Sequence, residues 1–311
     1  MVAIVIPAYK LTYLEEALSS IAAQTDRRFK LYIGDDASPE NLYEIVAKFE
    51  SRIPLSYIRF NENIGQKSLV SHWHRCIDLI KEEQWIWLFG DDDIMEPTCL
   101  ETFYKALDEQ PTYDLYKFNT MVIDKDGVAS TKRLGSFAEV VTSQDFLKSR
   151  LKWQNNSYVV EYIFRRKVYE SVAGFPDFAT ALASDDAFWA MVSLRSGIKS
   201  MSGPFVKWRY SGSNISSLRT DAKEKIKGAL QYMYWLKHTY PHYKQLTEEL
   251  QVTWLAGIFF NFKGHYNVRW LIGFVMGFKG LSAGFKAKSL LKYLQATCKG
   301  YIGSLKRIIK K

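Results

Sequence analysis

Short apolar runs alternate with helix-period segments over the first hundred residues of the chain. Four of the runs end in polar, glycine or proline residues, as buried strands do, and cover residues 2–7, 29–34, 55–60 and 85–89. Three segments between them carry apolar side chains at helical spacing, over residues 13–25, 39–49 and 66–81. This alternation predicts an α/β fold with a mainly parallel sheet, flanked by helices and joined by right-handed crossovers.

The pattern changes after residue 110. Residues 114–122 read as a strand followed by a turn at 124–127, and residues 159–164 and 205–210 read as further strands around a helix at 183–197. Beyond residue 220 the pattern is helical and rich in Trp, Phe and Lys. The sequence therefore predicts a catalytic or binding domain over residues 1–220 and a helical C-terminal region over residues 221–311.

Charge is distributed unevenly between these two parts. The chain has a formal net charge of +9, yet residues 221–311 alone hold 16 Lys and Arg against 4 Asp and Glu, which leaves residues 1–220 at −3. The hydrophobic share of 47% and the charged share of 24% are those of a globular protein and exclude a disordered or fibrous chain. Three scattered cysteines predict a reducing compartment, and we expect neither a signal peptide nor a membrane-spanning helix.

The basic residues of the tail have a helical arrangement. Lys292, Lys299 and Lys306 are spaced by seven, while apolar residues from Leu291 to Ile309 recur mainly at three or four. This pattern predicts an amphipathic basic helix, which lies next to an aromatic segment at 259–285 and is typical of an interfacial membrane anchor. We expect a cytoplasmic protein, peripheral on the inner face of the cell membrane. A helix packed on the first domain with its lysines in water is the alternative.

Three consecutive carboxylates follow the last of the first four predicted strands. Asp91, Asp92 and Asp93 repel one another near a strand end, and Mg²⁺ or Mn²⁺ would compensate them through oxygen ligands. If the chain is extended there, Asp91 and Asp93 point the same way and share one ligand site. A solvated turn or a cap for the helix after Pro97 is the alternative.

Asp35 and Asp36 end another strand of the same predicted sheet, which places them at the same edge. Carboxylates there can accept hydrogen bonds from a ribose hydroxyl or a base N–H, although Ser38 before Pro39 also reads as a plain helix cap. No GxGxxG or GxxxxGK[ST] motif follows these strands, which argues against the dinucleotide-binding and P-loop classes.

Taken in order, these motifs resemble the family 2 inverting nucleotide-sugar glycosyltransferases with the GT-A fold. The resemblance covers about residues 2–216 and rests on six segments of this sequence: the opening strand from Val2 to Tyr9, the first helix from Leu14 to Gln24, Asp35-Asp36-Ala37-Ser38, Asn63-Ile64-Gly65, Asp91-x-Asp93 and Ser184-Asp185-Asp186. Three departures are Lys10, where the family often has Asn, the stretch with His72 and His74, where it commonly has Asn, and Ser211, where an Arg-x-His segment has its His.

The resemblance implies a GT-A-like, Rossmann-like sheet in which residues 1–110 form the nucleotide-sugar half and residues 111–220 the acceptor half. It implies Mn²⁺ or Mg²⁺ held by Asp93 and Asp91. It also implies that a larger set of residues binds the nucleotide: Pro7, Ala8, Tyr9, Asp35, Asp36, Asn63, Gly65, Asp91, Asp92 and Arg209. Among these, Arg209 is expected to contact the diphosphate.

The same resemblance makes Asp185 the base that deprotonates the acceptor hydroxyl, with Asp186 as its competitor. The alternative is that Ser184-Asp185-Asp186 only caps the following helix. Two adjacent carboxylates should titrate as a pair, with one pKa raised. The expected reaction moves a sugar from a nucleotide-diphospho-sugar, UDP-sugar by default, to a saccharide or lipid-linked saccharide, as in cell-surface polysaccharide synthesis.

Two other classes remain as alternatives. A nucleotidyltransferase would also use carboxylate-held Mg²⁺, but no Lys-bearing glycine-rich loop follows the first strand. A non-enzymatic binder would use the basic tail on membrane or nucleic acid. Residues 1–220 carry a net charge of −3, which would repel the phosphate backbone of a nucleic acid. We therefore expect no nucleic-acid partner.

Aromatic and histidine residues give weaker expectations. Trp153, Trp189 and Trp208 are candidates to wall an acceptor cleft, because sugars stack their C–H faces on aromatic rings. His72 and His74 lie two apart on a predicted helix, where they diverge, so we expect them to be surface or partner-packing groups and not a metal pair.

Overall fold

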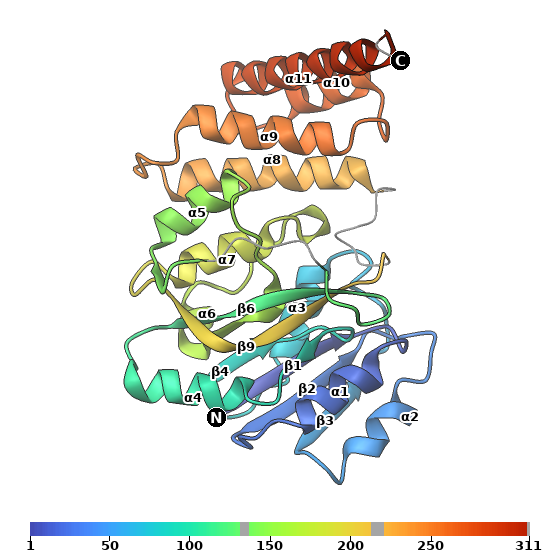
Figure 1. The fold of residues 1–311 in the computed structure, drawn as a ribbon, viewed down its shortest axis with the longest axis vertical. Helices are drawn as coiled ribbons and strands as arrows, with labels where there is room; N and C mark the ends of the chain where they lie inside the picture. Colours follow the sequence, from blue (N-terminus) through green and yellow to red (C-terminus); the bar gives the residue numbers. More distant parts are fainter. Residues whose placement is uncertain (131–136, 213–220, 310–311) are drawn as a thin grey trace.

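One mixed sheet of nine strands forms the centre of the molecule (Figure 1). The structure is a computed structural model that describes residues 1–130, 137–212 and 221–309, with side chains described through residue 299. The strand order is β3-β2-β1-β4-β8-β6-β9-β5, and β7 also pairs with β9. The strands are β1 (Val2–Ala8), β2 (Phe29–Asp35), β3 (Leu55–Arg59), β4 (Trp85–Leu88), β5 (Ile94–Met95), β6 (Leu115–Asp124), β7 (Val140–Val141), β8 (Tyr162–Arg165) and β9 (Ile198–Tyr210).

The first four strands are parallel, as predicted. β1 pairs with both β2 and β4, and β2 pairs with β3, with Ala8 level with Asp35 at their carboxyl ends. Four later pairings are antiparallel: β4 with β8, β6 with β8, β5 with β9 and β7 with β9. The sheet is therefore parallel in the half formed by β1 to β4 and mixed beyond it.

Both faces of the sheet are covered, which explains the unbroken apolar strands. Alternate residues of β1 enter two different cores: Ala3 and Val5 belong to one, and Val2, Ile4 and Ile6 to the other. A parallel strand buried on both faces needs apolar residues at every position. The helices before residue 220 are α1 (Leu14–Ala22), α2 (Tyr43–Val46), α3 (Leu69–Ile77), α4 (Cys99–Glu109), α5 (Ser143–Leu151), α6 (Arg166–Ser171) and α7 (Ser184–Val192).

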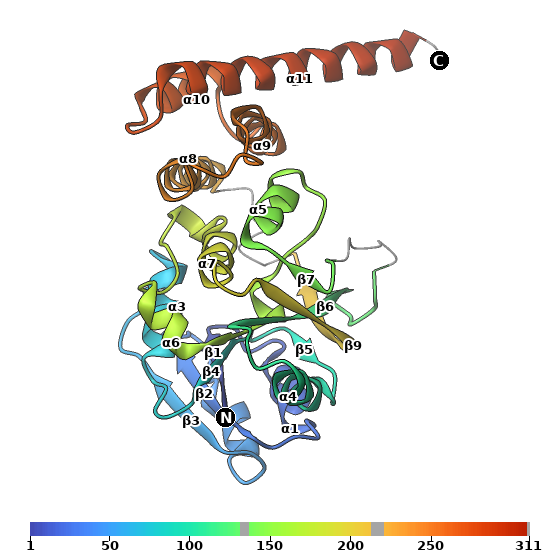
Figure 2. The same ribbon diagram turned by 90° about the vertical axis from the view of Figure 1, so that its left-hand side faces the viewer.

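Four helices form the C-terminal region and stack at the end of the molecule opposite β3 (Figures 1 and 2). They are α8 (Ala222–Thr239), α9 (Glu248–Asn261), α10 (Val268–Gly277) and α11 (Ala283–Ile309). Leu230, Trp254 and Phe285 from this region share a core with Phe188 and Trp189 of α7. The predicted helical tail is thus confirmed, and it packs on the preceding domain; the boundary near residue 220 stays a prediction.

Several elements differ from their expected extents, among them the helices expected at 66–81 and 183–197, which span only α3 and α7. Residues 39–49 form only α2 and a following 3-10 turn at Ala47–Phe49, and Val159–Glu161 is a 3-10 turn that precedes β8. The turn at Val159–Glu161 is closed by the Glu161 carboxylate, which accepts the Tyr158 N–H at 2.8 Å. The last predicted strand begins seven residues early, at Ile198, because β6 offers a long partner.

Candidate active site

The candidate site lies at the carboxyl ends of β1, β2 and β4, the edge at which parallel α/β sheets bind ligands. The first residue beyond β2, Asp36, donates its N–H to the Ala8 carbonyl at 2.9 Å, so the two strand ends continue side by side. Phe89, the first residue beyond β4, likewise donates its N–H to the Val5 carbonyl at 2.8 Å. The structure therefore brings the sequence-predicted groups of three separate strands to one place.

Asp35 is completely buried and organises the loop after β2. Its Oδ2 accepts the Tyr57 hydroxyl at 2.6 Å and Arg59 Nη1 at 2.9 Å, while Oδ1 accepts the Ser38 N–H at 2.8 Å. Ser38 Oγ in turn donates to the Tyr9 carbonyl at 2.7 Å. Burial and this carboxylate together raise the pKa of Tyr57 to about 12, so the phenol stays a donor. Asp35 thus fixes the backbone at Tyr9.

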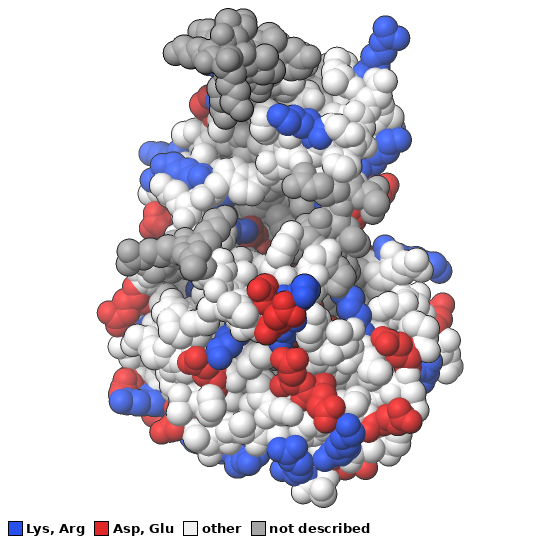
Figure 3. All heavy atoms as spheres, turned by 45° about the vertical axis from the view of Figure 1, so that its right-hand side comes forward, with Lys and Arg blue, Asp and Glu red and all other residues white. Residues whose placement is uncertain are grey.

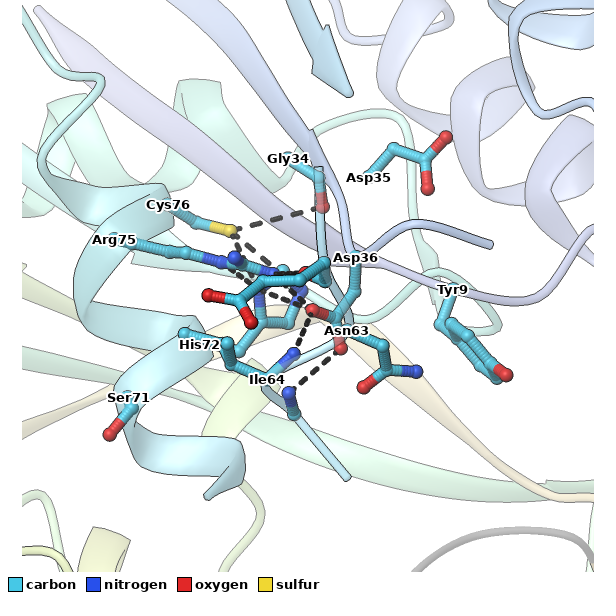
Figure 4. A network of polar contacts seen from close by, with 12 residues as sticks. Tyr9, Gly34, Asp35, Asp36, Asn63, Ile64, Ser71, His72, Arg75 and Cys76 are labelled. Carbon is cyan, nitrogen blue, oxygen red and sulfur yellow. Dashed lines mark hydrogen bonds and ion pairs between the residues drawn. The ribbon is translucent and has the colours of Figure 1, made fainter. Parts of the chain in front are cut away.

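Asp36 holds the segment that contains the Asn-x-Gly motif (Figure 4). Its Oδ1 and Oδ2 accept the N–H groups of Ile64 and Gly65, both at 2.9 Å, and Oδ1 also pairs with the Arg75 guanidinium. Burial raises the pKa of Asp36 above its usual value, against the opposing effect of the two amides and Arg75. Because a Cβ on residue 65 would lie 2.5 Å from Asp36 Oδ2, only glycine fits there without movement.

The helix behind Asp36 carries Arg75, which the sequence did not single out, and the histidines His72 and His74. Arg75 lies with its guanidinium carbon 3.8 Å from the Phe60 ring centre, which orients it toward Asp36. His72 is 2% exposed, and burial lowers its pKa to about 3, so its ring is neutral beside Asp36. The expectation that His72 lies at the surface is wrong. His74 also turns inward, where its Nε2 accepts the Phe175 N–H at 3.1 Å.

Asp91 ties the end of β4 to the end of β1. Its Oδ2 accepts the N–H groups of Tyr9 and Lys10, both at 2.9 Å. The Tyr9 side chain is 40% exposed, so its ring borders the site while its backbone is held. β4 ends at Leu88 and the chain bends at Asp91, so the strand alternation expected for Asp91 and Asp93 does not apply.

Asp92 and Asp93 are buried beside Asp91. Asp93 is 2% exposed, and its Oδ1 accepts the Arg209 N–H at 2.8 Å. A Cβ at residue 90 would lie 2.3 Å from Asp93 Oδ2, so Gly90 makes room for this carboxylate. Burial and the charges of the neighbouring carboxylates raise the pKa of Asp93 well above 3.8 and that of Asp92 to about 6.

The residues present fit a divalent hard cation. Neighbouring buried carboxylates with raised pKa values gain from a positive charge, and their oxygens are the donors that Mg²⁺ and Mn²⁺ prefer. Among residues 1–130, 137–212 and 221–299, no group of three His, Cys, Asp or Glu side chains is placed to enclose a metal ion by itself. Mg²⁺ is commonly bound by one or two protein carboxylates and completes its shell with water and phosphate oxygens.

Arg209 supports the turn that carries these carboxylates. Its side chain is 1% exposed, with Nε donating to the Asp92 carbonyl at 2.9 Å and Nη2 to Glu16 Oε2 at 2.6 Å. The guanidinium carbon also lies 4.1 Å from the Tyr13 ring centre. The structure thus gives Arg209 a positioning role, and its expected contact with a diphosphate stays a prediction.

Asp185 and Asp186 form a second carboxylate group at the start of α7. Asp186 is buried, and its two oxygens accept Arg150 Nε at 2.8 and 2.9 Å. Asp185 is half-buried, and burial together with the Asp186 charge raises its pKa to about 7. The predicted raised pKa therefore falls on Asp185, while Asp186 is held in an ion pair.

The chain that leads into α7 is strained. Thr180, Ala181 and Ala183 have φ values of 57°, 54° and 62°, a left-handed conformation that costs about 1 kcal/mol or more for residues other than glycine. Helix α8 holds this segment, since Gln231 Oε1 accepts the Ala179 N–H at 2.8 Å and a Cβ on Gly228 would meet the Ala179 carbonyl at 2.3 Å. The C-terminal region thus contributes to the position of Asp185, which the sequence did not indicate.

The three tryptophans expected near an acceptor lie in different surroundings. Trp189 is completely buried and packs on Tyr162 with ring centres 4.2 Å apart, so its predicted place in a cleft wall is wrong. Trp208 stacks on Tyr158 at 4.3 Å, and Trp153 is 53% exposed. Trp153 and Trp208 remain candidates for the wall of an acceptor cleft.

A mixed sheet with carboxylates gathered at the carboxyl ends of its parallel strands is the architecture of a GT-A glycosyltransferase, and the comparisons with known proteins agree. The sequence matches the model of Glycosyl transferase family 2 over residues 3–172, more than half of the chain, so the chain belongs to this family. It is accordingly a glycosyltransferase, and neither a nucleotidyltransferase nor a non-enzymatic binder. No curated protein matches the sequence.

Solved structures of other glycosyltransferases share the fold. S. aureus TarS 1–349 in complex with UDP-GlcNAc is similar at 17% identity and a TM-score of 0.60, covering 94% of this chain and 89% of that one. The mannosyltransferase PcManGT from Pyrobaculum calidifontis, in complex with GDP-Man and Mn²⁺, is similar at 13% identity and a TM-score of 0.52, covering 94% and 86%. At these identities the likeness concerns the fold alone.

Proposed function

We propose that this glycosyltransferase is metal-dependent and inverting, and that it moves a sugar from a UDP-sugar to a hydroxyl of a saccharide or lipid-linked saccharide in cell-surface polysaccharide synthesis. The observation that carries the proposal is that two adjacent carboxylates lie in different environments. Asp186 is fixed by Arg150, whereas Asp185 is half-buried with a pKa raised to about 7. A carboxylate of that basicity is suited to proton abstraction near neutral pH.

The donor would bind at the edge formed by β1, β2 and β4. Asp36 and Asp91 each use their oxygens to hold backbone amides, so they shape the loops at Gly65 and Tyr9 that face the nucleotide. The exposed Tyr9 ring offers a face on which a base can stack. Pro7 and Ala8 end β1, and Asn63 lies on the same loop as Gly65; these three residues complete the proposed nucleotide contacts.

Asp93 and Asp91 would hold Mn²⁺ or Mg²⁺, and Asp92 adds negative charge beside them. When bound, the ion neutralises the charge that develops on the departing nucleoside diphosphate. Support comes from the raised pKa values of these three carboxylates. PcManGT was solved with GDP-Man and Mn²⁺ and TarS with UDP-GlcNAc, which supports a nucleoside-diphosphate donor with a divalent cation.

In the transfer step, Asp185 would accept the proton of the acceptor hydroxyl as its oxygen attacks the anomeric carbon, and the bond to the diphosphate oxygen breaks on the opposite face. Arg150 holds the Asp186 carboxylate in an ion pair, and the strained segment at 180–183 fixes the angle at which Asp185 is presented. Such in-line geometry inverts the anomeric configuration.

Release of nucleoside diphosphate from a panel of UDP-, GDP- and dTDP-sugars tests the proposal, with Mn²⁺ or EDTA and with free or lipid-linked saccharides as acceptors. We expect Mn²⁺-dependent release from a UDP-sugar, a product of inverted configuration by NMR, and loss of transfer in Asp185→Asn. Asp108→Asn, an exposed carboxylate of α4, is the matched control and should keep full activity. Full activity of Asp185→Asn, or activity in EDTA, contradicts the mechanism.

A further inference from the structure

Helix α10 leaves an apolar stripe uncovered. Val268, Ile272 and Met276 recur every four residues and are 40%, 39% and 40% exposed, whereas Leu271 and Val275 are completely buried. A surface helix of a globular protein normally turns charged or polar residues to water opposite its buried face. On α10 the only charged residue is Arg269, so the helix is apolar on both sides.

The surroundings of this stripe are basic. From residue 250 to 299 the sequence holds seven Lys and Arg and no Asp or Glu. Lys288 and Lys292 are paired with Glu248 and Glu249 of α9, which are the last acidic residues of the chain. Arg269 and Lys279 are exposed near the two ends of α10. The stripe therefore lies between exposed cationic groups with no carboxylate later in the chain.

The position and anchoring of α10 suit contact with a flat surface. Figure 2 shows α10 and α11 as the outermost layer, at the end of the molecule farthest from β3. Lys286 Nζ donates to the carbonyls of Met276 at 2.7 Å and Phe278 at 3.0 Å, which caps α10 and fixes it to α11. On the face drawn in Figure 3, Lys and Arg spread over this end, while Asp and Glu gather mainly over the lower part. The surface is thus preformed and cationic.

We propose that α10 lies in the headgroup region of an anionic lipid surface, with Val268, Ile272 and Met276 inserted and Arg269 and Lys279 on lipid phosphates. An in-plane position agrees with the finding that, of the residues described, no helix is long and apolar enough to cross a membrane. Charge complementarity favours anionic lipid over a second copy, because two copies would bring the same basic surroundings together.

The proposal adds to the basic helix predicted from the sequence. Within the side chains described, α11 exposes Leu291 and Leu294 at 57% and 37%, but its Lys288 and Lys292 face Glu248 and Glu249. Lys306, the third member of the spacing by seven, lies outside the described side chains. We therefore assign insertion to α10. The inference rests on surface chemistry and is independent of the reaction proposed at Asp185.

Co-sedimentation of the full chain with vesicles tests the assignment. The vesicles are phosphatidylcholine alone and phosphatidylcholine mixed with phosphatidylglycerol, each at low and high salt. We expect binding to the anionic vesicles that weakens in salt. The apparent partition constant should fall about tenfold in Ile272→Asp, since a charge replaces an isoleucine that inserts into the lipid. Leu194→Asp is the matched control, because Leu194 is 53% exposed on the turn after α7, and it should bind as the wild type does. Arg269→Glu combined with Lys279→Glu should remove the preference for phosphatidylglycerol.

Four results would overturn the assignment: no binding to anionic vesicles, equal binding to neutral ones, wild-type binding by Ile272→Asp, or a lipid-free dimer that Ile272→Asp converts to monomer. The last result would identify the stripe as an interface between copies. UDP binding by each protein is measured in parallel, in solution. Absence of vesicle binding by the wild type with its UDP binding intact refutes this inference alone, and absence of UDP binding in all of the proteins refutes the proposed donor alone.

Discussion

Arg150 holds Asp186 through its Nε, at 2.8 and 2.9 Å from the two carboxylate oxygens, and this ion pair sets the properties of the adjacent Asp185. The guanidinium fixes the position of the Asp186 carboxylate, and the pKa of Asp185 is raised to about 7, mainly by burial and further by the negative charge of Asp186. One carboxylate is thereby structural and the other is available as a base.

Exchange of each carboxylate for its amide separates the two roles. Asp185→Asn should lower kcat by about 10²- to 10⁴-fold, the usual contribution of a general base, and leave the Kd for nucleotide unchanged. Asp186→Asn should keep a measurable kcat, because the base remains. Steady-state kinetics with calorimetric Kd values check both variants, and the reverse ranking of the two kcat values would make Asp186 the base.

The pH dependence of transfer follows from the raised pKa of Asp185. A base works when deprotonated, so kcat should rise tenfold per pH unit below about pH 7 and level off above it. Asp186→Asn removes a negative neighbour, which lowers the pKa of Asp185 and moves the rising limb to lower pH. A pH–rate profile records both effects. An unshifted limb in Asp186→Asn would show that the limb belongs to another group.

Gly65 is needed because the Asp36 carboxylate occupies the place of its side chain. Gly65→Ala puts a Cβ 2.5 Å from Asp36 Oδ2, so the loop must move, with a loss of about 1–3 kcal/mol of stability and weaker nucleotide binding. In the matched control, Gly284→Ala on α11, the new Cβ meets nothing within 4 Å, and a gain of about 0.5–1 kcal/mol is expected from helix propensity. Urea unfolding and UDP titration measure the two changes. Equal stability of both variants would contradict the packing described for Asp36.

The parallel half of the sheet and the edge that holds Asp36 and Asp91 could be predicted from the sequence. The strands before Ala8, Asp35 and Leu88 are buried on both faces, so each reads as an apolar run, and the parallel topology then places Asp36 and Asp91 at one edge. The residues that form hydrogen bonds and ion pairs with these carboxylates could not be predicted from the sequence. Asp36 and Arg75 are 39 positions apart, and no local pattern indicates that they meet.

The acceptor side was harder to foresee. Asp185 was singled out by resemblance, yet its pKa depends on Arg150, 35 positions earlier and on another helix, and its loop depends on Gln231 of α8. Trp189 was wrongly placed in a cleft wall because an aromatic residue in a core and one in a binding site look alike in sequence. Its stacking on Tyr162 is a property of the fold.

Arg209 offers a test between a positioning role and direct contact with the donor. Its Nε and Nη2 reach the Asp92 carbonyl and Glu16 separately, which a lysine ammonium cannot reproduce. Arg209→Lys should therefore lower stability by about 1–3 kcal/mol, as expected when buried polar groups lose their partners. Thermal unfolding and the KM for donor are measured together. Unchanged stability with a raised KM would instead indicate that the guanidinium binds the diphosphate.

The central claim is that the carboxylates at the ends of β2 and β4, beside the end of β1, form a metal-assisted nucleotide site. Calorimetric titration with UDP, GDP and dTDP, each in Mn²⁺ and again in EDTA, tests it most directly, with wild type, Asp93→Asn and the exposed control Asp108→Asn. The account predicts that UDP binds in Mn²⁺, and that binding is lost in EDTA and in Asp93→Asn but kept in Asp108→Asn. Binding of equal strength in EDTA and in Asp93→Asn, or no binding of any of the three nucleotides, would contradict it.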